Sequence, residues 1–500
     1  MEDFLLPSDL RGLHIHFVGI KGTGMAALTE ILCQRGARIT GSDVADTFYT
    51  DQVLAACGIT ASSFDAANIT GDLLCVIHSS AYSEATNCEL QEARRRGIPC
   101  LLYSQALGQL SAHAYSCGIA GVHGKTTTTG LVGTILAQLR LPVQVLAGSL
   151  ISSFGGAGEG SCTLSLGQEF FVAETCEYQR HFMDFHPRKI ILTSVESDHQ
   201  DYFPTYEAIL SAFVDYACLL PEGGQLIYCA DDAGATEAAS VVAGKRPDIQ
   251  LVPYGEAARG EYKLTFGQVE EGRQCFYLAG FGSHPFYLQV PGRHLVLNAA
   301  AAIALSVELL REAGRSPESE SAGLAERLAC GLAAFRGGKR RSELIGRRDK
   351  LVILDDYAHH PTAIRTTLAG YREFYPGCKL VVDFMSHTYT RTAALLEEFA
   401  AAFADADEVV LHRIYGSARE DASASGVDGT TLYRATCRHH PAVRYYEEFM
   451  DAADDLEGEL AQGDRNFPGG IVFVTMGAGD NWKLGRELWR RLGAEPAAKQ

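Results

Sequence analysis

The sequence predicts an α/β protein built from three domains in series. Its 500 residues exceed what one hydrophobic core usually serves, and about 150 residues per domain suggests roughly three domains. Apolar residues make up 47% of the chain and charged residues 21%, which is typical of a globular protein. Short apolar strands alternate with glycine turns and helix-like segments in three successive runs. This alternation predicts mainly parallel sheets.

The first run, predicted as domain 1–111, opens with the strand HIHFVGI at 14–20. A glycine turn leads into a helix, and the chain returns as the strand ARITGSD at 37–43. This βαβ unit predicts a Rossmann-like sheet. The segments LLCVIHSSA at 73–81 and ATNCELQEARRRG at 85–97 continue it as a further strand and helix.

The second run, predicted as domain 112–333, is expected to form another parallel sheet with a small antiparallel one after it. Its strands are predicted at YSCGIAG (115–121), EFFVAET (169–175), KIILTSV (189–195) and QLIYCA (225–230), followed by antiparallel strands within 258–290. Helices are predicted over 126–139 and 295–314, and the polar segment RSPESESAG at 315–323 is predicted to be a surface loop.

The third run, predicted as domain 334–500, repeats the alternation. Its strands are KLVILDDY (350–357), CKLVVDFMS (378–386), DEVVLHRI (407–414) and GIVFVTMG (470–477), with helical stretches such as 391–406 between them.

Composition limits the classes of partner. The formal net charge of -18 argues against general binding of nucleic acid or of anionic membranes, because both require a basic surface. The sequence shows no secretory leader and no run of about 18 apolar residues, so we expect a cytoplasmic protein without membrane insertion. The 14 cysteines are scattered without a CxxC pair, as expected in a reducing compartment. Both a monomer and a homodimer remain open.

The segment from Gly118 to Thr129 is nearly a phosphate-binding loop. The common pattern places a glycine five residues before the final Gly-Lys-Thr, and here Ile119 occupies that place. The chemistry still works: backbone N-H groups and a helix N-terminus face a phosphate, Lys125 adds a cation, and the hydroxyl of Thr126 is a ligand for Mg²⁺. A chance glycine turn is the weaker alternative.

Two predicted strand ends add candidate metal ligands. Glu174 ends the strand EFFVAET, and in a parallel sheet that end faces the ligand crevice. Glu177, three residues on, is equally well explained as a solvated surface acid. His199 follows the next strand in a segment that also carries Glu196, Asp198 and Asp201, which indicates a second metal site.

The first glycine turn indicates a second diphosphate site. Its glycines, Gly19, Gly22 and Gly24, run G-x-x-G-x-G, which is not the dinucleotide fingerprint. Asp43 ends the next strand, where an acid binds a ribose hydroxyl. Two such sites suggest a phosphate donor in one domain and a nucleotide-tagged substrate in another.

At these residues the chain resembles the ATP-dependent Mur ligases. The likeness begins near residue 13 and rests on motifs in family order: HFVGIKGTGM, GSD at 41–43, GVHGKTTT, the Glu174 strand end, SDHQDYF, PGRHLVLNAAAA, FRGGKRRSE, DDYAHHPT, SHTYTRT, IYGSARE and MGAGD. Family loops read Gly-Thr-x-Gly-Lys-Thr, so the short spacing is retained with Val122 in the threonine place. The resemblance implies the three-domain Mur ligase architecture: an N-terminal Rossmann-like UDP-binding domain, a central P-loop ATPase domain and a C-terminal Rossmann-like domain that receives the amino acid.

The resemblance also implies roles for individual residues. ATP contacts are expected from Gly121, Gly124, Lys125, Thr126, Thr127, Asn298 (adenine), Arg341 (phosphate) and Asp356 (ribose). Mg²⁺ ligands are expected from Thr126, Glu174 and His199. Substrate contacts are expected from Gly19, Gly22, Gly24, Asp43, Ser80, His359, His387 and Arg391. Catalysis is expected to involve Lys125, His199, Arg341, His359, His387 and Arg391.

The implied activity is that of an ATP-dependent amide-bond-forming ligase with ATP and Mg²⁺ as cofactors. It would join L-alanine to the carboxylate of UDP-N-acetylmuramate in peptidoglycan precursor synthesis. A carboxylate is a poor acyl donor, so it first attacks the γ-phosphate of ATP, and the amine then attacks the acyl phosphate. This chemistry depends on positioning and charge neutralisation more than on an acid-base pair.

The chain departs from the family pattern at three places. Leu295 follows His294 where the family usually has His-Asn, which affects the expected adenine pocket. Thr388 follows His387 where a cation is often found. No lysine lies between Lys189 and Lys245 to be carbamylated as in many Mur ligases, a feature shared with the alanine-adding branch.

Three other functions stay open at this stage. A muropeptide-recycling ligase, which adds a whole tripeptide to UDP-N-acetylmuramate, shares the core motifs, and DDYAHHPTAI leans towards it while SHTYTRT and IYGSARE favour alanine. A nicotinamide dehydrogenase would explain the first glycine turn but not the Lys125 loop. A non-catalytic nucleotide-binding module would bind ATP without turnover.

Overall fold

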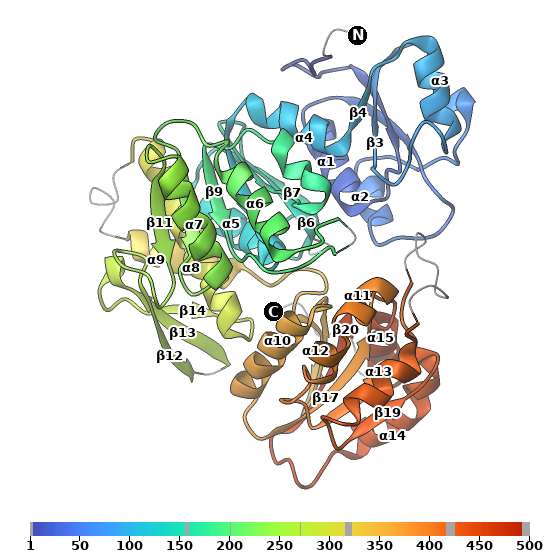
Figure 1. The fold of residues 1–500 in the computed structure, drawn as a ribbon, viewed down its shortest axis with the longest axis vertical. Helices are drawn as coiled ribbons and strands as arrows, with labels where there is room; N and C mark the ends of the chain where they lie inside the picture. The colour runs from blue at the N-terminus through green and yellow to red at the C-terminus, as the bar shows by residue number, and fades with distance from the viewer. Residues whose placement is uncertain are drawn as a thin grey trace.

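The protein is described by a computed structural model that covers residues 4–155, 160–200, 202–270, 272–315, 323–416 and 426–492. Four sheets lie in three successive units, drawn blue, cyan to yellow, and orange to red in Figure 1. The central unit contacts both of the others. Asp201, residues 316–322 of the predicted loop and the end of the IYGSARE motif, 417–420, lie outside the described residues.

The first unit is the predicted Rossmann-like sheet. Its strands are β1 (His14–Val18), β2 (Arg38–Ser42), β3 (Leu73–His78) and β4 (Cys100–Leu102), parallel and in the order β2-β1-β3-β4. Its helices are α1 (Thr23–Gln34), α2 (Asp51–Ala56), α3 (Cys88–Arg96) and α4 (Tyr103–Ala112), with the 3₁₀ turn η1 (Ala66–Asn68). Because β1 and β2 are parallel, with Val18 opposite Ser42, their ends place the first glycine turn beside Asp43.

The central unit contains a seven-stranded sheet in the order β11-β10-β9-β5-β8-β6-β7. Its strands are β5 (Tyr115–Ala120), β6 (Val143–Ile151), β7 (Ser161–Ser165), β8 (Phe170–Glu174), β9 (Lys189–Leu192), β10 (Gln225–Cys229) and β11 (Gln250–Tyr254). Its helices are α5 (Lys125–Leu139), η2 (Tyr178–Asp184), α6 (Tyr206–Ala217), α7 (Ala233–Lys245), α8 (Arg293–Glu312) and α9 (Leu324–Ala334). The expected all-parallel sheet is corrected at one edge, where β7 runs antiparallel to β6.

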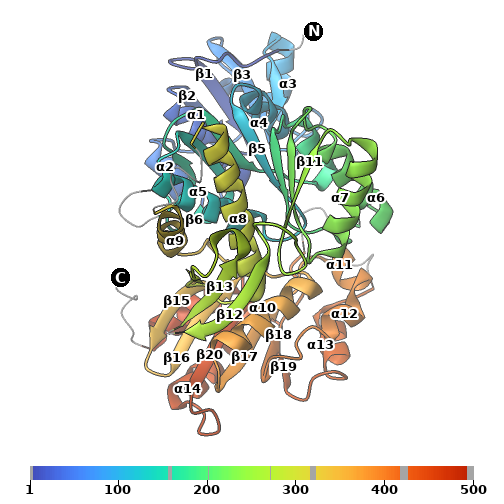
Figure 2. The same ribbon diagram turned by 90° about the vertical axis from the view of Figure 1, so that its left-hand side faces the viewer.

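The antiparallel sheet of this unit is formed as predicted, by β12 (Leu264–Glu270), β13 (Arg273–Leu278) and β14 (Phe286–Leu288), with the turn η3 (Ala279–Phe281). Helix α8 follows it and packs against α5, which also packs against α9 (Figure 2). By length and composition α8 could cross a membrane, but 83% of its apolar window is buried inside the protein. Helix α8 is therefore a buried core helix of the central unit.

The third unit has a six-stranded sheet in the order β15-β16-β20-β17-β18-β19, in which only the β15–β16 pairing is antiparallel among the described strands. Its strands are β15 (Glu343–Arg348), β16 (Leu351–Asp356), β17 (Cys378–Met385), β18 (Glu408–Leu411), β19 (Val443–Tyr445) and β20 (Gly470–Gly477). Its helices are α10 (Pro361–Phe374), α11 (Tyr389–Ala394), α12 (Leu396–Ala400), α13 (Gly429–Thr436), η5 (Phe449–Ala452), α14 (Ala453–Gln462) and α15 (Trp482–Arg491). The helical stretch predicted over 391–406 is broken at Leu395, which leaves the helical region (φ -121°, ψ 28°).

The sheet changes after β4 and again after α9, close to the predicted domain limits at 111/112 and 333/334. The exact limits stay a prediction.

Candidate functional site

The phosphate loop joins β5 to α5, as the sequence predicts. Gly121 and Gly124 have φ angles of 133° and 83°, a region that side chains with a Cβ adopt with strain. At Gly124 a Cβ would also come within 2.6 Å of Asn298 Oδ1 in helix α8. Thr126 and Thr127 form the first turn of α5 and are buried. The loop therefore presents the N-terminus of a long helix to the site.

Lys125 is held by the carboxylate of Glu177, for which the sequence allowed either a metal ligand or a solvated surface acid. Its Nζ donates to the carbonyl oxygens of Gly121 and Val122 and to the carboxylate of Glu177, at 3.0 Å. Glu177 is 2% exposed, so the alternative of a solvated surface acid is wrong. Burial disfavours the charge on each side chain, but their attraction outweighs it, so the pKa of Lys125 is raised and that of Glu177 is lowered.

His199 lies beside this ion pair. Its Nε2 is 3.6 Å from Glu177 and 3.9 Å from the carboxylate of Asp198. The ring packs against Tyr178 with a centroid distance of 4.8 Å, and its residue adopts a φ of 53°. His199 is thus joined to the phosphate loop through Glu177 rather than through Glu174.

Thr126 and Glu174 are in direct contact, as expected of two ligands to one metal. The Thr126 hydroxyl donates to Glu174 Oε2 at 2.8 Å, and the Gly148 N-H donates to the same oxygen at 2.8 Å. A Cβ at Gly148 would lie 2.5 Å from that oxygen, so close backbone approach fixes the carboxylate. A hydroxyl and a carboxylate are the hard oxygen donors that Mg²⁺ prefers, so these residues fit the ion.

The third unit meets the central unit at Asp198. Arg391 donates to Asp198 Oδ1 from Nη2 at 2.8 Å and from Nε at 3.3 Å, and both side chains are nearly buried. Burial works against the charge of Asp198, but Arg391 outweighs it and lowers the pKa of the carboxyl. Arg391 also donates to the carbonyl oxygen of His387 at 3.1 Å. The ion pair thus lies beside His199 and reaches the segment that carries His387.

His359 completes this group. Its ring lies 6.5 Å from that of His387, and its Nδ1 is 2.8 Å from the Tyr357 carbonyl oxygen. Burial and the charge of Arg391 lower the pKa of His359 well below its usual value, so the imidazole is neutral. The structure therefore brings together His199, His359, His387 and Arg391, which come from both units.

The expected adenine side lies along α8. Asn298 is 6% exposed and touches the phosphate loop at Gly124, while Leu295 is 5% exposed. Burial lowers the pKa of His294 to about 4, and among the described residues no hydrogen-bond partner reaches its Nδ1. Leu295 is therefore a buried apolar side chain, and the Nδ1 atom of His294 is a polar atom without a hydrogen-bond partner among the described residues.

Arg341 and Asp356 lie at the start of the third unit. The Arg341 guanidinium stacks over the Tyr357 ring at 5.0 Å. Asp356 is 7% exposed, and its two oxygens accept hydrogen bonds from the backbone N-H groups of Ser342 and Ala358, at 2.7 and 2.8 Å. Burial raises the pKa of Asp356. Asp356 thus anchors the turn that carries Arg341, and its contact with ribose stays a prediction.

The first glycine turn is closely packed. A Cβ at Gly19 would lie 2.6 Å from Tyr82, and one at Gly24 would lie 2.9 Å from Tyr103, whereas Gly22 caps α1 with more room. Asp43 accepts hydrogen bonds from the N-H groups of Lys21 at 2.7 Å and Val44 at 2.8 Å. Asp43 therefore holds the turn. Ser80 is exposed and follows β3, which pairs with β1 on the side opposite β2.

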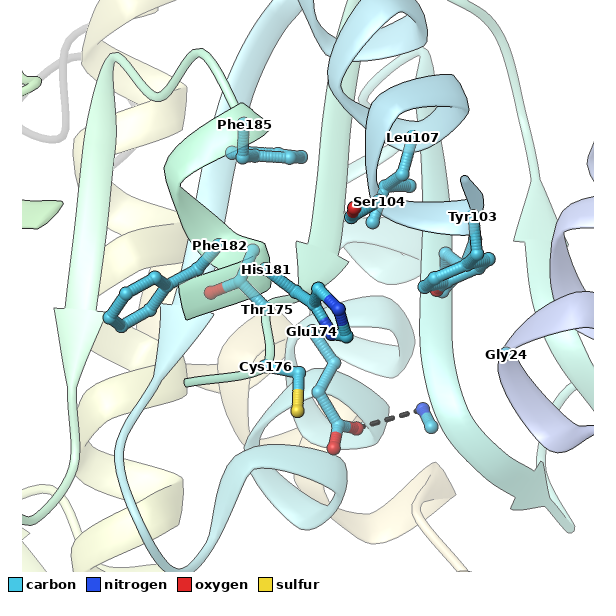
Figure 3. A pocket seen from close by; sticks show the side chains of 12 residues that line it. Gly24, Tyr103, Ser104, Leu107, Glu174, Thr175, Cys176, His181, Phe182 and Phe185 are labelled. Carbon is cyan, nitrogen blue, oxygen red and sulfur yellow. Dashed lines mark hydrogen bonds between the residues drawn. The ribbon is translucent and has the colours of Figure 1, made fainter. Parts of the chain in front are cut away.

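A cavity of about 160 Å³ separates the first unit from Glu174. Gly24 of α1 and Tyr103, Ser104 and Leu107 of α4 line one side. The other side is lined by residues of β6, β8 and the segment after it: Leu146, Gly148, Glu174, Thr175, Cys176, His181, Phe182 and Phe185. In Figure 3 the α4 side chains face the segment that carries His181 and Phe185, and the Glu174 carboxylate lies at the far end. The cavity thus connects the first glycine turn with the magnesium candidates.

The sequence alone does not predict that four residues take part in contacts where the central and third units meet: His123, Glu196, Asp198 and His360. For Glu196 and Asp198 the sequence signal is their position after β9, beside His199. His123 and His360 carry no such signal, because their meeting depends on how the third unit docks.

Profiles of known families match nearly the whole chain. The Mur ligase family catalytic domain matches residues 14–115, the Mur ligase middle domain matches 119–306, and the Mur ligase, glutamate ligase domain matches 340–479. The chain belongs to the Mur ligase family.

Individual Mur ligases match this chain over nearly its full length. The UDP-N-acetylmuramate–L-alanine ligase of Treponema pallidum is 49% identical over 496 residues, which cover 99% of this chain and 100% of the relative. The ligase of the same name from Desulfitobacterium hafniense is 36% identical, covering 95% and 99%. The crystal structure of UDP-N-acetylmuramate-alanine ligase MurC from Thermotoga maritima matches with a TM-score of 0.72 at 25% identity, covering 96% and 99%. These matches confirm the predicted three-domain architecture.

The murein peptide ligase of Psychrobacter arcticus matches with a TM-score of 0.60 at 22% identity, over 97% of this chain and 100% of that one. This likeness shows a shared fold and carries no argument about the substrate.

Proposed function

We propose that this protein is an ATP-dependent ligase that joins L-alanine to the carboxylate of UDP-N-acetylmuramate through an acyl-phosphate intermediate. The observation that carries the proposal is the full-length likeness to proteins named UDP-N-acetylmuramate–L-alanine ligase, 49% identical in the Treponema pallidum relative. The site supports it, because the phosphate loop, the oxygen-donor pair and the Arg391 group lie together at the meeting of the units. The dehydrogenase alternative is set aside, because it leaves the Lys125 loop unexplained.

Lys125 and the N-terminus of α5 would bind the terminal phosphates of ATP. Lys125 is already desolvated and oriented by Glu177, so a phosphate would replace or share that contact at little cost in ordering the side chain. Thr126 and Glu174 would hold Mg²⁺, which neutralises phosphate charge when it is bound. His199 stands beside Glu177 as the further proposed metal ligand.

The UDP-sugar would bind across the first and central units. Its diphosphate would lie at the first glycine turn, where α1 begins, and the cavity beside Gly24 leads from there towards Glu174. This arrangement would bring the sugar carboxylate to the γ-phosphate. Gly24, close to Tyr103, would keep that passage open.

The third unit would supply the amino acid. Arg391 carries a positive charge that suits a substrate carboxylate or the acyl phosphate. The His359 imidazole, whose lowered pKa makes it a weak base, would position the amine through a hydrogen bond rather than take its proton. Closure of this unit over the loop would exclude water, which would otherwise hydrolyse the acyl phosphate. The ion pair between Arg391 and Asp198 joins the third unit to the central unit, so the structure shows these two units in contact.

The experiment is a comparison of amines. Purified protein with ATP, Mg²⁺ and UDP-N-acetylmuramate is supplied with L-alanine, with the tripeptide or with no amine, and both phosphate and amide product are quantified. Equal amounts of phosphate and L-alanyl product support the proposal. Product only with the tripeptide assigns the recycling reaction, and ATP binding without product in any arm assigns a non-catalytic module.

A further inference from the structure

Three side chains from separate elements meet where the central and third units touch. His123 belongs to the phosphate loop, Glu196 follows β9, and His360 is the N-cap of α10. Each offers one ligand atom, and these three atoms all lie within 4.8 Å of one another. None of the three belongs to the Thr126, Glu174 and His199 set discussed above.

Glu196 lies between the two imidazoles. One of its oxygens pairs with His123 Nε2 and lies 3.8 Å from His360 Nδ1. Its other oxygen accepts a hydrogen bond from the Thr362 hydroxyl at 3.0 Å. The two imidazole rings have a centroid separation of 5.3 Å. Thr362 thus orients the carboxylate from outside the cluster, as outer-shell residues do at metal sites.

His360 provides a second, independent indication of a ligand. It is 6% exposed, and within the described part of the chain its buried Nε2 has no hydrogen-bond partner. A buried polar atom without a partner costs about 1 to 3 kcal/mol, so proteins seldom leave one unsatisfied without a function. The ring atom that now faces Glu196 is Nδ1, so a cation bound beside Glu196 would remove this deficit by turning the ring over and taking Nε2 as its ligand.

The donor set selects a class of metal. Two imidazole nitrogens and one carboxylate suit Zn²⁺ and neighbouring transition-metal ions, whereas Mg²⁺ prefers oxygen donors alone. A set of three protein ligands leaves the fourth tetrahedral position for water. The oxygen pair of Thr126 and Glu174 is therefore chemically distinct from this cluster.

We propose that His123, Glu196 and His360 form a site for a transition-metal dication, with Zn²⁺ as the probe, that links the phosphate loop to the third unit. Two ligands come from the central unit and one from the third, so all three act together only when the units are in contact. Metal binding and contact between the units therefore favour each other. The site goes beyond the proposed ligase activity and does not depend on it.

The experiment measures Zn²⁺ binding by calorimetric titration of the full chain, freed of metal with a chelator, in excess Mg²⁺. His360→Asn keeps an N-cap acceptor but removes the imidazole, and Glu196→Gln keeps an acceptor for Thr362 but removes the charge. The matched control is His439→Asn, which alters a histidine on the surface of the third unit. Thermal melting verifies that each variant is folded.

The expected result is one high-affinity Zn²⁺ per chain. Each of the two test variants should weaken its binding by more than about 10-fold, the smaller loss seen when an outer-shell partner is removed, and the control should not change it. X-ray absorption should show only nitrogen and oxygen ligands, at about 2.0–2.2 Å. No tight binding, unchanged affinity in both test variants, or sulfur ligands at about 2.3 Å from any of the 14 cysteines would overturn the proposal.

Discussion

The guanidinium of Arg391 lies 2.8 Å from the carboxylate of Asp198, and this ion pair joins the third unit to the strand-end segment that carries His199. Both side chains are nearly buried, so removing one partner leaves the other as an uncompensated charge. The pair therefore links the position of the third unit to the geometry of the site.

The first prediction concerns this pair. Arg391→Ala should weaken the contact between the units by about 3 to 5 kcal/mol and lower the rate of amide formation, because Asp198 loses its partner. Small-angle scattering should show a larger radius of gyration for the variant. Arg413→Ala, which removes a partly exposed arginine of the same unit that pairs with Glu448, should change neither quantity. An unchanged radius with full activity would show that the pair does not hold the units together.

The second prediction separates catalysis from stability at Lys125. Lys125→Met should slow phosphate release by about 10²- to 10³-fold, because a cation at the transferring phosphate is lost. It should also lower the melting temperature, since the buried carboxylate of Glu177 loses its lysine partner. The double variant with Glu177→Gln should recover melting temperature but not activity. Recovery of activity in the double variant would contradict the assigned role of Lys125.

The third prediction concerns Mg²⁺. Thr126→Val and Glu174→Gln should each raise the Mg²⁺ concentration needed for half-maximal activity, by about 10- to 100-fold, because each removes an oxygen donor. Thr128→Val is the matched control in the same helix: its hydroxyl is buried and without a hydrogen-bond partner among the described residues. An equal Mg²⁺ requirement in all three variants would place the ion elsewhere.

The fourth prediction is a pH dependence of stability from His294. Burial lowers its pKa to about 4 in the folded protein, whereas an unfolded chain has a value of about 6.5. Below pH 6.5 the unfolded chain takes up the proton first, so stability falls as the pH drops towards 4, by at most about 3 kcal/mol. The melting temperature of His294→Phe should fall less steeply over this interval than that of the unchanged protein or of His439→Asn. Parallel curves would contradict the buried neutral imidazole.

Much of the fold was predictable because its units are local. Contiguous segments of the sequence encode the βαβ pattern of β1, α1 and β2 and the apolar strands β8 and β9. Glu174 ends β8, and the segment that carries His199 follows β9. The antiparallel edge strand β7 was missed, because pairing direction depends on how the chain returns rather than on the strand's own residues.

The site was less predictable where it depends on contacts between distant segments. Glu177 looked equally like a surface acid, and its burial depends on contacts with Lys125 and His199, which come from distant segments. The contacts of His360 with Glu196 and of Asp198 with Arg391 form only because the third unit docks against the central unit. Hydrophobic periodicity describes single elements and carries no information on such docking.

The most direct test of the central claim follows an oxygen atom. UDP-N-acetylmuramate labelled with ¹⁸O in its carboxylate is incubated with the protein, ATP, Mg²⁺ and L-alanine, and the released phosphate is analysed by mass spectrometry. The acyl-phosphate account predicts one ¹⁸O in each phosphate, transferred from the carboxylate, together with an equal amount of L-alanyl amide. Unlabelled phosphate would show that water attacks ATP instead, and would contradict the account.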